Sequence, residues 1–117
     1  ADSIKIDVIQ AGQGRDRRGQ GWPPIELERT SVTGIRHVDG TVSMARAGVT
    51  SATSSFFICI GPQPALDFGG KRNPDGQGFA AFGRVVRGMD VVRRIHQEPA
   101  NAQNLVAPVV IREAVRK

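Results

Sequence analysis

The sequence predicts a mainly β domain, either a small closed barrel or a sandwich, with one clear α-helix. Three apolar, β-prone runs lie in the middle of the chain, separated by turn-forming segments: Thr41–Ala45, Ser55–Ile60 and Phe79–Val86. Only one segment, Gly88–Gln97, has the periodicity of an amphipathic helix. A chain of 117 residues can form a single core, so we expect one domain over residues 1–117.

The composition is that of an ordinary globular protein, with 39% hydrophobic and 23% charged residues. No apolar run is long enough to cross a bilayer, so we expect a soluble protein without a membrane partner. The net charge of +5 could indicate a nucleic-acid partner. The positive charges are scattered, however, and the chain has no Tyr and no aromatic pattern of the RNA-binding type. We therefore expect no nucleic-acid partner.

The N-terminal part begins with a strand. Residues Ile4–Gln10 alternate apolar and polar side chains, which is typical of a strand buried on one face. A loop rich in glycine and arginine follows, and then Trp22, which we expect to cover one end of the barrel. Ile25–Arg29 is a candidate short strand, with Ile25 and Leu27 facing inward.

The central strands contain the residues that matter most for function. Val32–Gly40 is a turn-rich connection, and Val42 supplies core contacts in the strand after it. Phe56 and Phe57 are adjacent, so their side chains point to opposite faces of a strand. One ring enters the core, and the other faces whatever the neighbouring loops surround. The small, polar loop Gly48–Ser54 would let the backbone approach a bound peptide closely.

The C-terminal half alternates turns and regular elements. Phe68–Gly78 is glycine-rich and contains a strong turn signal at Asn73–Gly76, but not the pattern of a phosphate-binding loop. In the expected helix, Met89, Val92 and Ile95 form an apolar stripe. We expect a loop at residues 101–108 and a closing strand at residues 109–115, where apolar and polar side chains alternate.

The cysteine and histidine residues do not indicate covalent or metal chemistry. Cys59 lies inside an apolar run and is best interpreted as a small buried side chain without a neighbouring base. His37 has no second His or Cys at ligand spacing, and is expected to be structural or solvated. His96 is explained by its place at the C-terminal end of the helix, where a positive group is favourable. We expect no metal ion and no organic cofactor.

Several separated blocks resemble one family, the cyclophilin-type peptidyl-prolyl isomerases. The blocks, in the order of the family, are VIQAG, IRHVDGTVSMARAG, SFFICIG, LDF and GFAAFGRVVRGMDVVRRI. The resemblance is closest to bacterial-type members and covers Ile4 to about Val115. It implies a cyclophilin-like antiparallel barrel that lacks its first strands and first helix here. It also implies a location in the bacterial cytoplasm or periplasm, although the sequence does not decide the compartment.

The resemblance also implies site residues. Gln10, which would position the substrate carbonyl, and Phe57, the floor of a proline pocket, are the implied catalytic residues. The implied substrate-binding positions are Val8, Ala45, Arg46, Ser55, Ala65, Leu66 and Phe79. The family's catalytic arginine precedes the VIQ block, where this chain has only ADSIKI. Arg46 is a conceivable substitute donor, but a solvated surface arginine is the simpler interpretation.

The resemblance leaves three functional hypotheses open. The first is a peptidyl-prolyl isomerase acting on Pro-containing peptides or unfolded protein, from which the N-terminal part is missing. The second is a module that binds Pro-containing segments with weak or no catalysis. The third is an assembly fragment whose open strand edges pair with a second chain or with its own copy. Because missing strands would expose apolar core and open backbone edges, we expect the chain alone to be non-monomeric or only marginally stable.

Overall fold

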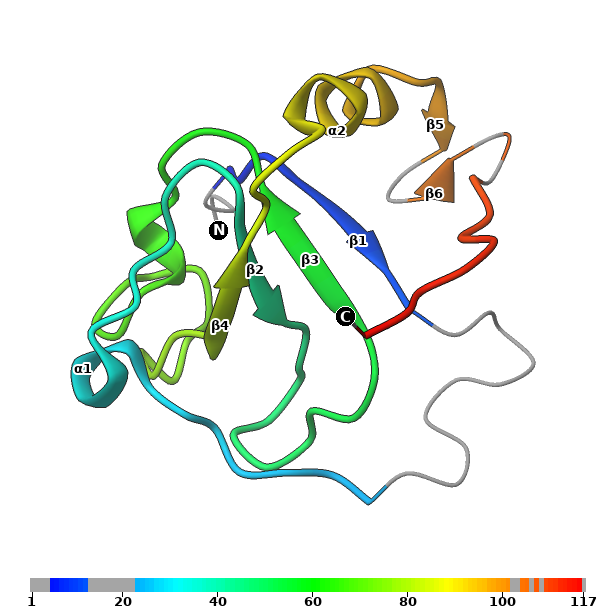
Figure 1. Cartoon of the computed structure of the whole chain (residues 1–117). Coiled ribbons are helices and arrows are strands. Elements are labelled where there is room, and N and C mark those ends of the chain that lie inside the picture. The colour runs from blue at the N-terminus through cyan, green and yellow to red at the C-terminus, as the bar shows by residue number, and fades with distance from the viewer. Residues whose placement is uncertain (1–4, 13–22, 102–103, 106, 108, 117) are drawn as a thin grey trace.

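The computed structural model describes residues 5–12, 23–101, 104, 105, 107 and 109–116. Its centre is a four-stranded antiparallel sheet with the order β1-β3-β2-β4 (Figure 1). The strands are β1 (Val8–Ala11), β2 (Thr41–Met44), β3 (Phe56–Cys59) and β4 (Ala81–Arg84). β2, β3 and β4 lie within segments that the sequence predicts to be strands, whereas β1 overlaps the predicted strand Ile4–Gln10 and extends one residue beyond it; each strand is shorter than predicted. The sheet does not close on itself within the described residues.

The register of the sheet determines which residues share a face. Gln10 of β1 lies opposite Phe57 of β3, and Ser43 of β2 lies opposite Phe57 from the other side. Because directly opposed residues of antiparallel strands point to the same face, these three side chains belong together. Phe56 lies opposite Met44 on the other face. The register therefore separates the two adjacent phenylalanines, as the alternation predicts.

The edge strand β4 meets β2 through an irregular register. The pairing shifts between Val42 and Ser43, which leaves Phe82 without a directly opposed residue. Such a bulge bends the strand and redirects side chains locally. Phe82 is 54% exposed, although it lies in an apolar strand.

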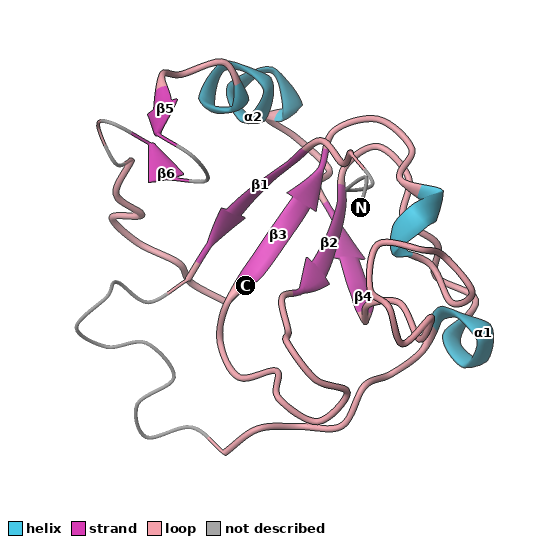
Figure 2. Cartoon of the chain, turned by 180° about the vertical axis from the view of Figure 1, so that it is seen from behind, coloured by secondary structure: helices cyan, strands magenta, loops and turns pink. Residues whose placement is uncertain are grey.

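The helical elements frame the sheet. Helix α2 (Met89–His96) confirms the expected amphipathic helix: Val92 is buried, and Asp90 lies in its first turn. Figures 1 and 2 show α2 next to one end of β1. Two short elements were not predicted, the single turn α1 (Thr30–Thr33) and the 3₁₀ turn η2 (Pro64–Leu66). Within the described ranges, no helix is long and apolar enough to cross a membrane.

Three predictions about the ends of the domain need correction or have no test. Residues 109–116 contain no strand, and Val109, Val110 and Ile111 are exposed, because no neighbouring strand pairs with them. The expected loop at residues 101–108 instead contributes to a small hairpin, β5 (Ala100–Asn101) with β6 (Asn104–Leu105). Trp22 lies outside the described residues.

The candidate strand at residues 25–29 is also wrong. It forms an isolated bridge between Ile25 and Ala52 and one further backbone hydrogen bond, from the Leu27 amide to the Val49 carbonyl at 3.0 Å, but no continuous ladder. Leu27 is buried as expected, but Ile25 is 48% exposed. A single bridge does not hold consecutive side chains in strict alternation. Ile25 therefore does not face inward together with Leu27.

The hydrophobic core lies between the Phe57 face of the sheet and the loops that follow β3. Its buried members are Phe57 and Cys59 from β3, Leu66 from η2, and Phe79 just before β4. Ile6, Val8 and Ala45 pack against this cluster. Residues far apart in the sequence therefore meet at one face, and this face contains most of the implied site residues.

Candidate active site

The centre of the site is an aromatic pair. The rings of Phe57 and Phe79 lie edge to face, with centroids 5.5 Å apart and planes at 88°. This is a favourable arrangement for two rings, because the positive edge of one meets the negative face of the other. Leu66 is fully buried beside them. The structure thus brings together three of the residues implied for the proline pocket, and leaves 4% of Phe57 exposed.

The rim of this cluster comes from the flanking strands. Val8 and Ala45 are half-buried and pack against the cluster from β1 and from the end of β2. Gln10 is exposed and lies directly opposite Phe57 in the β1–β3 pair. A peptide above Phe57 would therefore lie within reach of a free amide group that both donates and accepts hydrogen bonds.

Arg46 is not a solvated surface residue, and in this respect the sequence interpretation is wrong. Its side chain is only 1% exposed. The guanidinium lies over the Phe79 ring, 5.1 Å from the centroid. It donates to the Gly78 carbonyl at 2.8 and 2.6 Å, and to both carboxylate oxygens of Asp75 at 2.9 and 3.0 Å. A planar guanidinium over an aromatic face with a bidentate carboxylate is held firmly in place.

The ion pair with Arg46 changes the pKa of Asp75. The hydrogen bonds from Arg46 lower the pKa of Asp75 below its ordinary value, and a backbone hydrogen bond from Gln77 adds to this effect. The ion pair links the end of β2 to the glycine-rich loop at residues 68–78. Its position next to Phe79 fixes one side of the aromatic cluster.

The other two implied substrate positions are less central. Ser55 is half-buried, and its carbonyl accepts a hydrogen bond from the Ala45 amide at 3.0 Å. The Ala65 carbonyl accepts from the Arg72 amide at 3.2 Å. Ala65 is half-buried but does not belong to the aromatic cluster. The structure therefore places Ser55 and Ala65 around the cluster without including them in it.

Sequence reasoning missed a set of linked polar residues beneath Phe57, which we call the buried polar chain: Ser43 and His37, which are buried, and Asp67, which is half-buried. The His37 Nδ1 lies 2.7 Å from Asp67 Oδ1, and Nε2 lies 2.8 Å from Ser43 Oγ. The imidazole also lies parallel to the Phe57 ring, with centroids 6.0 Å apart and planes at 17°. Burial lowers the pKa of His37, although the hydrogen bond from Nδ1 and the negative charge of Asp67 oppose this effect.

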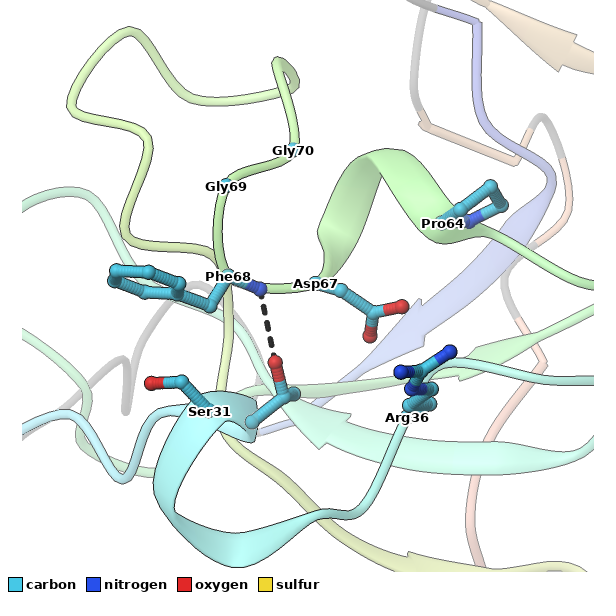
Figure 3. A pocket seen from close by; sticks show the side chains of 8 residues that line it. Ser31, Arg36, Pro64, Asp67, Phe68, Gly69 and Gly70 are labelled. Carbon is cyan, nitrogen blue, oxygen red and sulfur yellow. Dashed lines mark hydrogen bonds between the residues drawn. The ribbon is translucent and has the colours of Figure 1, made fainter.

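A polar cavity of about 490 Å³ lies between α1 and the segment from Pro64 to Gly70 (Figure 3). The Arg36 and Asp67 side chains are turned toward this space, and the amide of Phe68 donates to Thr30 Oγ1 at 2.8 Å. Asp67 therefore lines the cavity and also contacts His37. The cavity shares no other residue with the aromatic cluster or the buried polar chain.

Cys59 is a core residue, and its surroundings do not favour a reactive thiol. Cys59 is fully buried, and burial, together with the negative charges of Asp67 and Asp39, raises its pKa to about 12. Such a thiol stays protonated and unreactive, which agrees with its interpretation as a core residue. Among the residues that the structure describes, no three His, Cys, Asp or Glu side chains gather to hold a metal ion.

Comparison with known proteins identifies the family. The family model of the cyclophilin type peptidyl-prolyl cis-trans isomerase/CLD matches residues 3–116. Peptidyl-prolyl cis-trans isomerase A of Dickeya dadantii is 40% identical over 98 residues, covering 79% of this chain and 48% of that protein. Peptidyl-prolyl cis-trans isomerase-like 1 of Neurospora crassa is 36% identical over 110 residues, covering 92% of this chain and 62% of that protein.

A third relative agrees with these two. The peptidyl-prolyl cis-trans isomerase of Acinetobacter baylyi is 35% identical over 99 residues, covering 84% of this chain and 50% of that protein. The chain spans about half the length of the curated relatives it matches. These matches confirm the resemblance seen in the sequence blocks, and the chain belongs to the cyclophilin-type peptidyl-prolyl cis-trans isomerase family.

Proposed function

We propose that the protein accelerates cis-trans rotation of Xaa-Pro bonds and thereby assists protein folding. The observation that carries the proposal is the aromatic cluster of Phe57, Leu66 and Phe79, with the exposed Gln10 opposite Phe57. An apolar floor next to a free amide suits a proline ring followed by a peptide carbonyl. The proposed substrates are Pro-containing peptides and unfolded chains.

The reaction needs no nucleophile. Rotation about the Xaa-Pro bond is slow because amide resonance imposes a barrier of about 18–20 kcal/mol. A catalyst must hold the proline ring, hold the neighbouring carbonyl and favour the twisted bond. In the proposed complex, the proline ring lies against Phe57, which Leu66 supports from the interior, and the Gln10 amide donates to the carbonyl. Stabilising the twisted state more than the planar ones is what raises the rate.

A hydrogen bond donated to the prolyl nitrogen would also favour the twisted bond, and we assign no residue of this chain to donate it. The residues before Val8 contain no arginine. Arg46 already donates to Asp75 and Gly78, so it would have to leave both partners to reach a peptide. This engagement favours a second candidate function for the chain by itself, the binding of Pro-containing segments with slow turnover.

Exchange spectroscopy on a short Ala-Pro peptide tests the proposal. The chain offers a matched pair of variants, Phe57→Leu and Phe56→Leu, which make the same change on opposite faces of β3. We expect wild-type protein to raise the cis-trans exchange rate above the uncatalysed rate. Phe57→Leu should reduce that increase by about tenfold, since the ring would contact the substrate in the twisted state. Phe56→Leu should keep it.

The outcomes separate the two candidate functions. Peptide signals that shift without faster exchange would support the binding module and contradict the enzyme. No effect on the peptide, in a sample that the protein spectrum shows to be folded, would contradict both functions. An equal loss in the two variants would mean that the face of Phe57 has no special role.

We further propose that an additional partner strand supports this site. An apolar cavity of about 320 Å³ lies along β4, lined by Ile35, Val38 and Phe82 among others. These three side chains are 42%, 52% and 54% exposed. Because β1 and β4 form the edges of the sheet, their outer backbone groups can accept a strand from a second chain or from another copy.

A further inference from the structure

The buried polar chain has the residue order of a hydrolase triad but cannot act as one. A serine, a histidine and an aspartate are joined by contacts of 2.8 and 2.7 Å. Ser43 is 0% exposed and His37 is 1% exposed, so no substrate carbonyl can reach the hydroxyl. A nucleophilic role is therefore excluded, and the buried polar chain must be explained by what it contacts.

The hydrogen bonds define one tautomer of His37. Asp67 Oδ1 lies 2.9 Å from the His37 backbone amide and 2.7 Å from Nδ1. A carboxylate oxygen only accepts, so Nδ1 carries the proton. Nε2 is then the acceptor, and the Ser43 hydroxyl donates to it at 2.8 Å. Every polar atom of the imidazole is satisfied in this arrangement, and rotating the ring by half a turn would leave the pairs mismatched.

The fixed imidazole contacts the proposed proline pocket from below. Its plane lies parallel to the Phe57 ring at a centroid distance of 6.0 Å. Ser43 is also the residue directly opposite Phe57 in the β2–β3 pair. At the other end, Asp67 directly follows Leu66, the buried wall of the cluster. The buried polar chain therefore joins the floor and the wall of the pocket, which belong to segments far apart in the sequence.

We propose that His37, held in its Nδ1-protonated tautomer by Asp67, is a positioning residue for the proline pocket. It sets the orientation of the Phe57 ring and ties it to Leu66. The inference rests on the proposed function, because it gives His37 a task in proline binding. A side chain that served stability alone would need no defined ring orientation beneath Phe57.

The tautomer can be measured directly in the wild-type protein. A long-range ¹⁵N–¹H correlation spectrum distinguishes Nδ1-protonated from Nε2-protonated imidazole. We expect His37 to show the proton on Nδ1, with and without the Ala-Pro peptide, while His96, which is exposed and has its Nε2 3.6 Å from Asp7, gives a second imidazole signal in the same spectrum. A proton on Nε2, or averaging between the two tautomers, would overturn the proposal.

Two variants at one position test the consequence for binding. Asp67→Ala removes the acceptor, whereas Asp67→Asn keeps a carbonyl oxygen that can accept both N–H groups. We expect Asp67→Ala to shift the Phe57 ring signals of the free protein and to weaken Ala-Pro peptide binding by about tenfold, which corresponds to about 1.4 kcal/mol of binding free energy. Asp67→Asn should restore the ring signals and most of the affinity.

The alternative outcomes are distinct. A folded Asp67→Ala protein with unchanged Phe57 signals and unchanged affinity would overturn the proposal, since its effect would be limited to stability. If Asp67→Ala does not fold, two measurements still test the proposal. They are the tautomer of His37 in the wild type, and the Phe57 ring signals and peptide affinity of Asp67→Asn, which we expect to match those of the wild type. Absence of peptide binding by the wild type would contradict the proposed function instead, and the ring signals of the free variants would still report whether His37 positions Phe57.

Discussion

At the residue scale, the Arg46–Asp75 pair holds one side of the site, and it makes stability depend on pH. The pKa of Asp75 is lowered in the folded protein by hydrogen bonds from Arg46. Because this pKa is lower in the folded protein than the ordinary aspartate value of about 4, the pair stabilises the protein at pH values above about 4. The contribution is lost as the pH falls through the pKa of Asp75 in the folded protein. The ion pair should therefore stabilise the protein at neutral pH and fail in acid.

This leads to a test with a matched control. Asp75→Asn should lower the urea midpoint at pH 7, and the difference from wild type should shrink as the pH falls from about 5 to below 3. Glu26→Gln removes the same charge at an exposed position, and should give no such pH-dependent difference. A difference between wild type and Asp75→Asn that stays constant over this range would contradict the role of the pair.

The sequence allows only part of the site to be predicted at this scale. Alternation alone separates Phe57 from Phe56, because it depends on neighbouring residues. The contact of His37 with Asp67 joins positions 30 residues apart and depends on the path of two loops. No spacing rule encodes such a contact. The burial of Arg46 depends in the same way on the glycine-rich loop, which brings Asp75 and the Gly78 carbonyl to it.

At the element scale, the glycine-rich loop is tightly packed at Gly78 but open at Gly76. Gly78 has a φ of +73°, and a Cβ there would lie 2.6 Å from the Asp67 carbonyl carbon. Gly76 has a φ of +66°, and a Cβ there would meet nothing within 4 Å. Both positions require the left-handed conformation, but only Gly78 also requires the space that a missing side chain leaves.

The two glycines therefore form a pair of variants. Gly76→Ala should cost about 1–2 kcal/mol of unfolding free energy from backbone strain alone. Gly78→Ala should cost about 1–3 kcal/mol more, because the backbone at Asp67 and Phe68 must move. Urea denaturation of both variants measures the difference. Equal costs would mean that the loop does not pack on residues 67–68 as described.

Element types were predicted better than element ends. The central strands and α2 follow from apolar periodicity, which local sequence contains. The strand expected at residues 109–115 also alternates, yet the described part of this segment forms no strand and its valines are exposed. Alternation makes a segment able to pair, but a strand forms only where a neighbour offers its backbone. That condition depends on the whole fold and cannot be read from the segment.

At the scale of the whole molecule, exposed apolar side chains along β4 predict association. We expect the purified chain to sediment as a concentration-dependent mixture rather than as a single monomer, because the cavity beside Phe82 offers an apolar surface next to an open strand edge. Phe82→Thr should shift the distribution toward monomer. Val32→Thr, at a residue that is 83% exposed and outside this cavity, should leave it unchanged.

Two results would contradict association through the surface beside β4. A sharp, concentration-independent monomer of the wild type would contradict the prediction. An equal response to Phe82→Thr and Val32→Thr would mean that general hydrophobicity, and not the surface beside β4, drives the association.

The central claim is that proline-containing peptides bind on the Phe57 face of the sheet. Intermolecular nuclear Overhauser effects between the proline ring of an Ala-Pro peptide and the protein test it most directly. We predict contacts from the proline ring to Phe57 and Val8, and a shifted side-chain amide signal of Gln10. Contacts to Phe56 or Phe82 instead, or none in a folded sample at saturating peptide, would contradict the account.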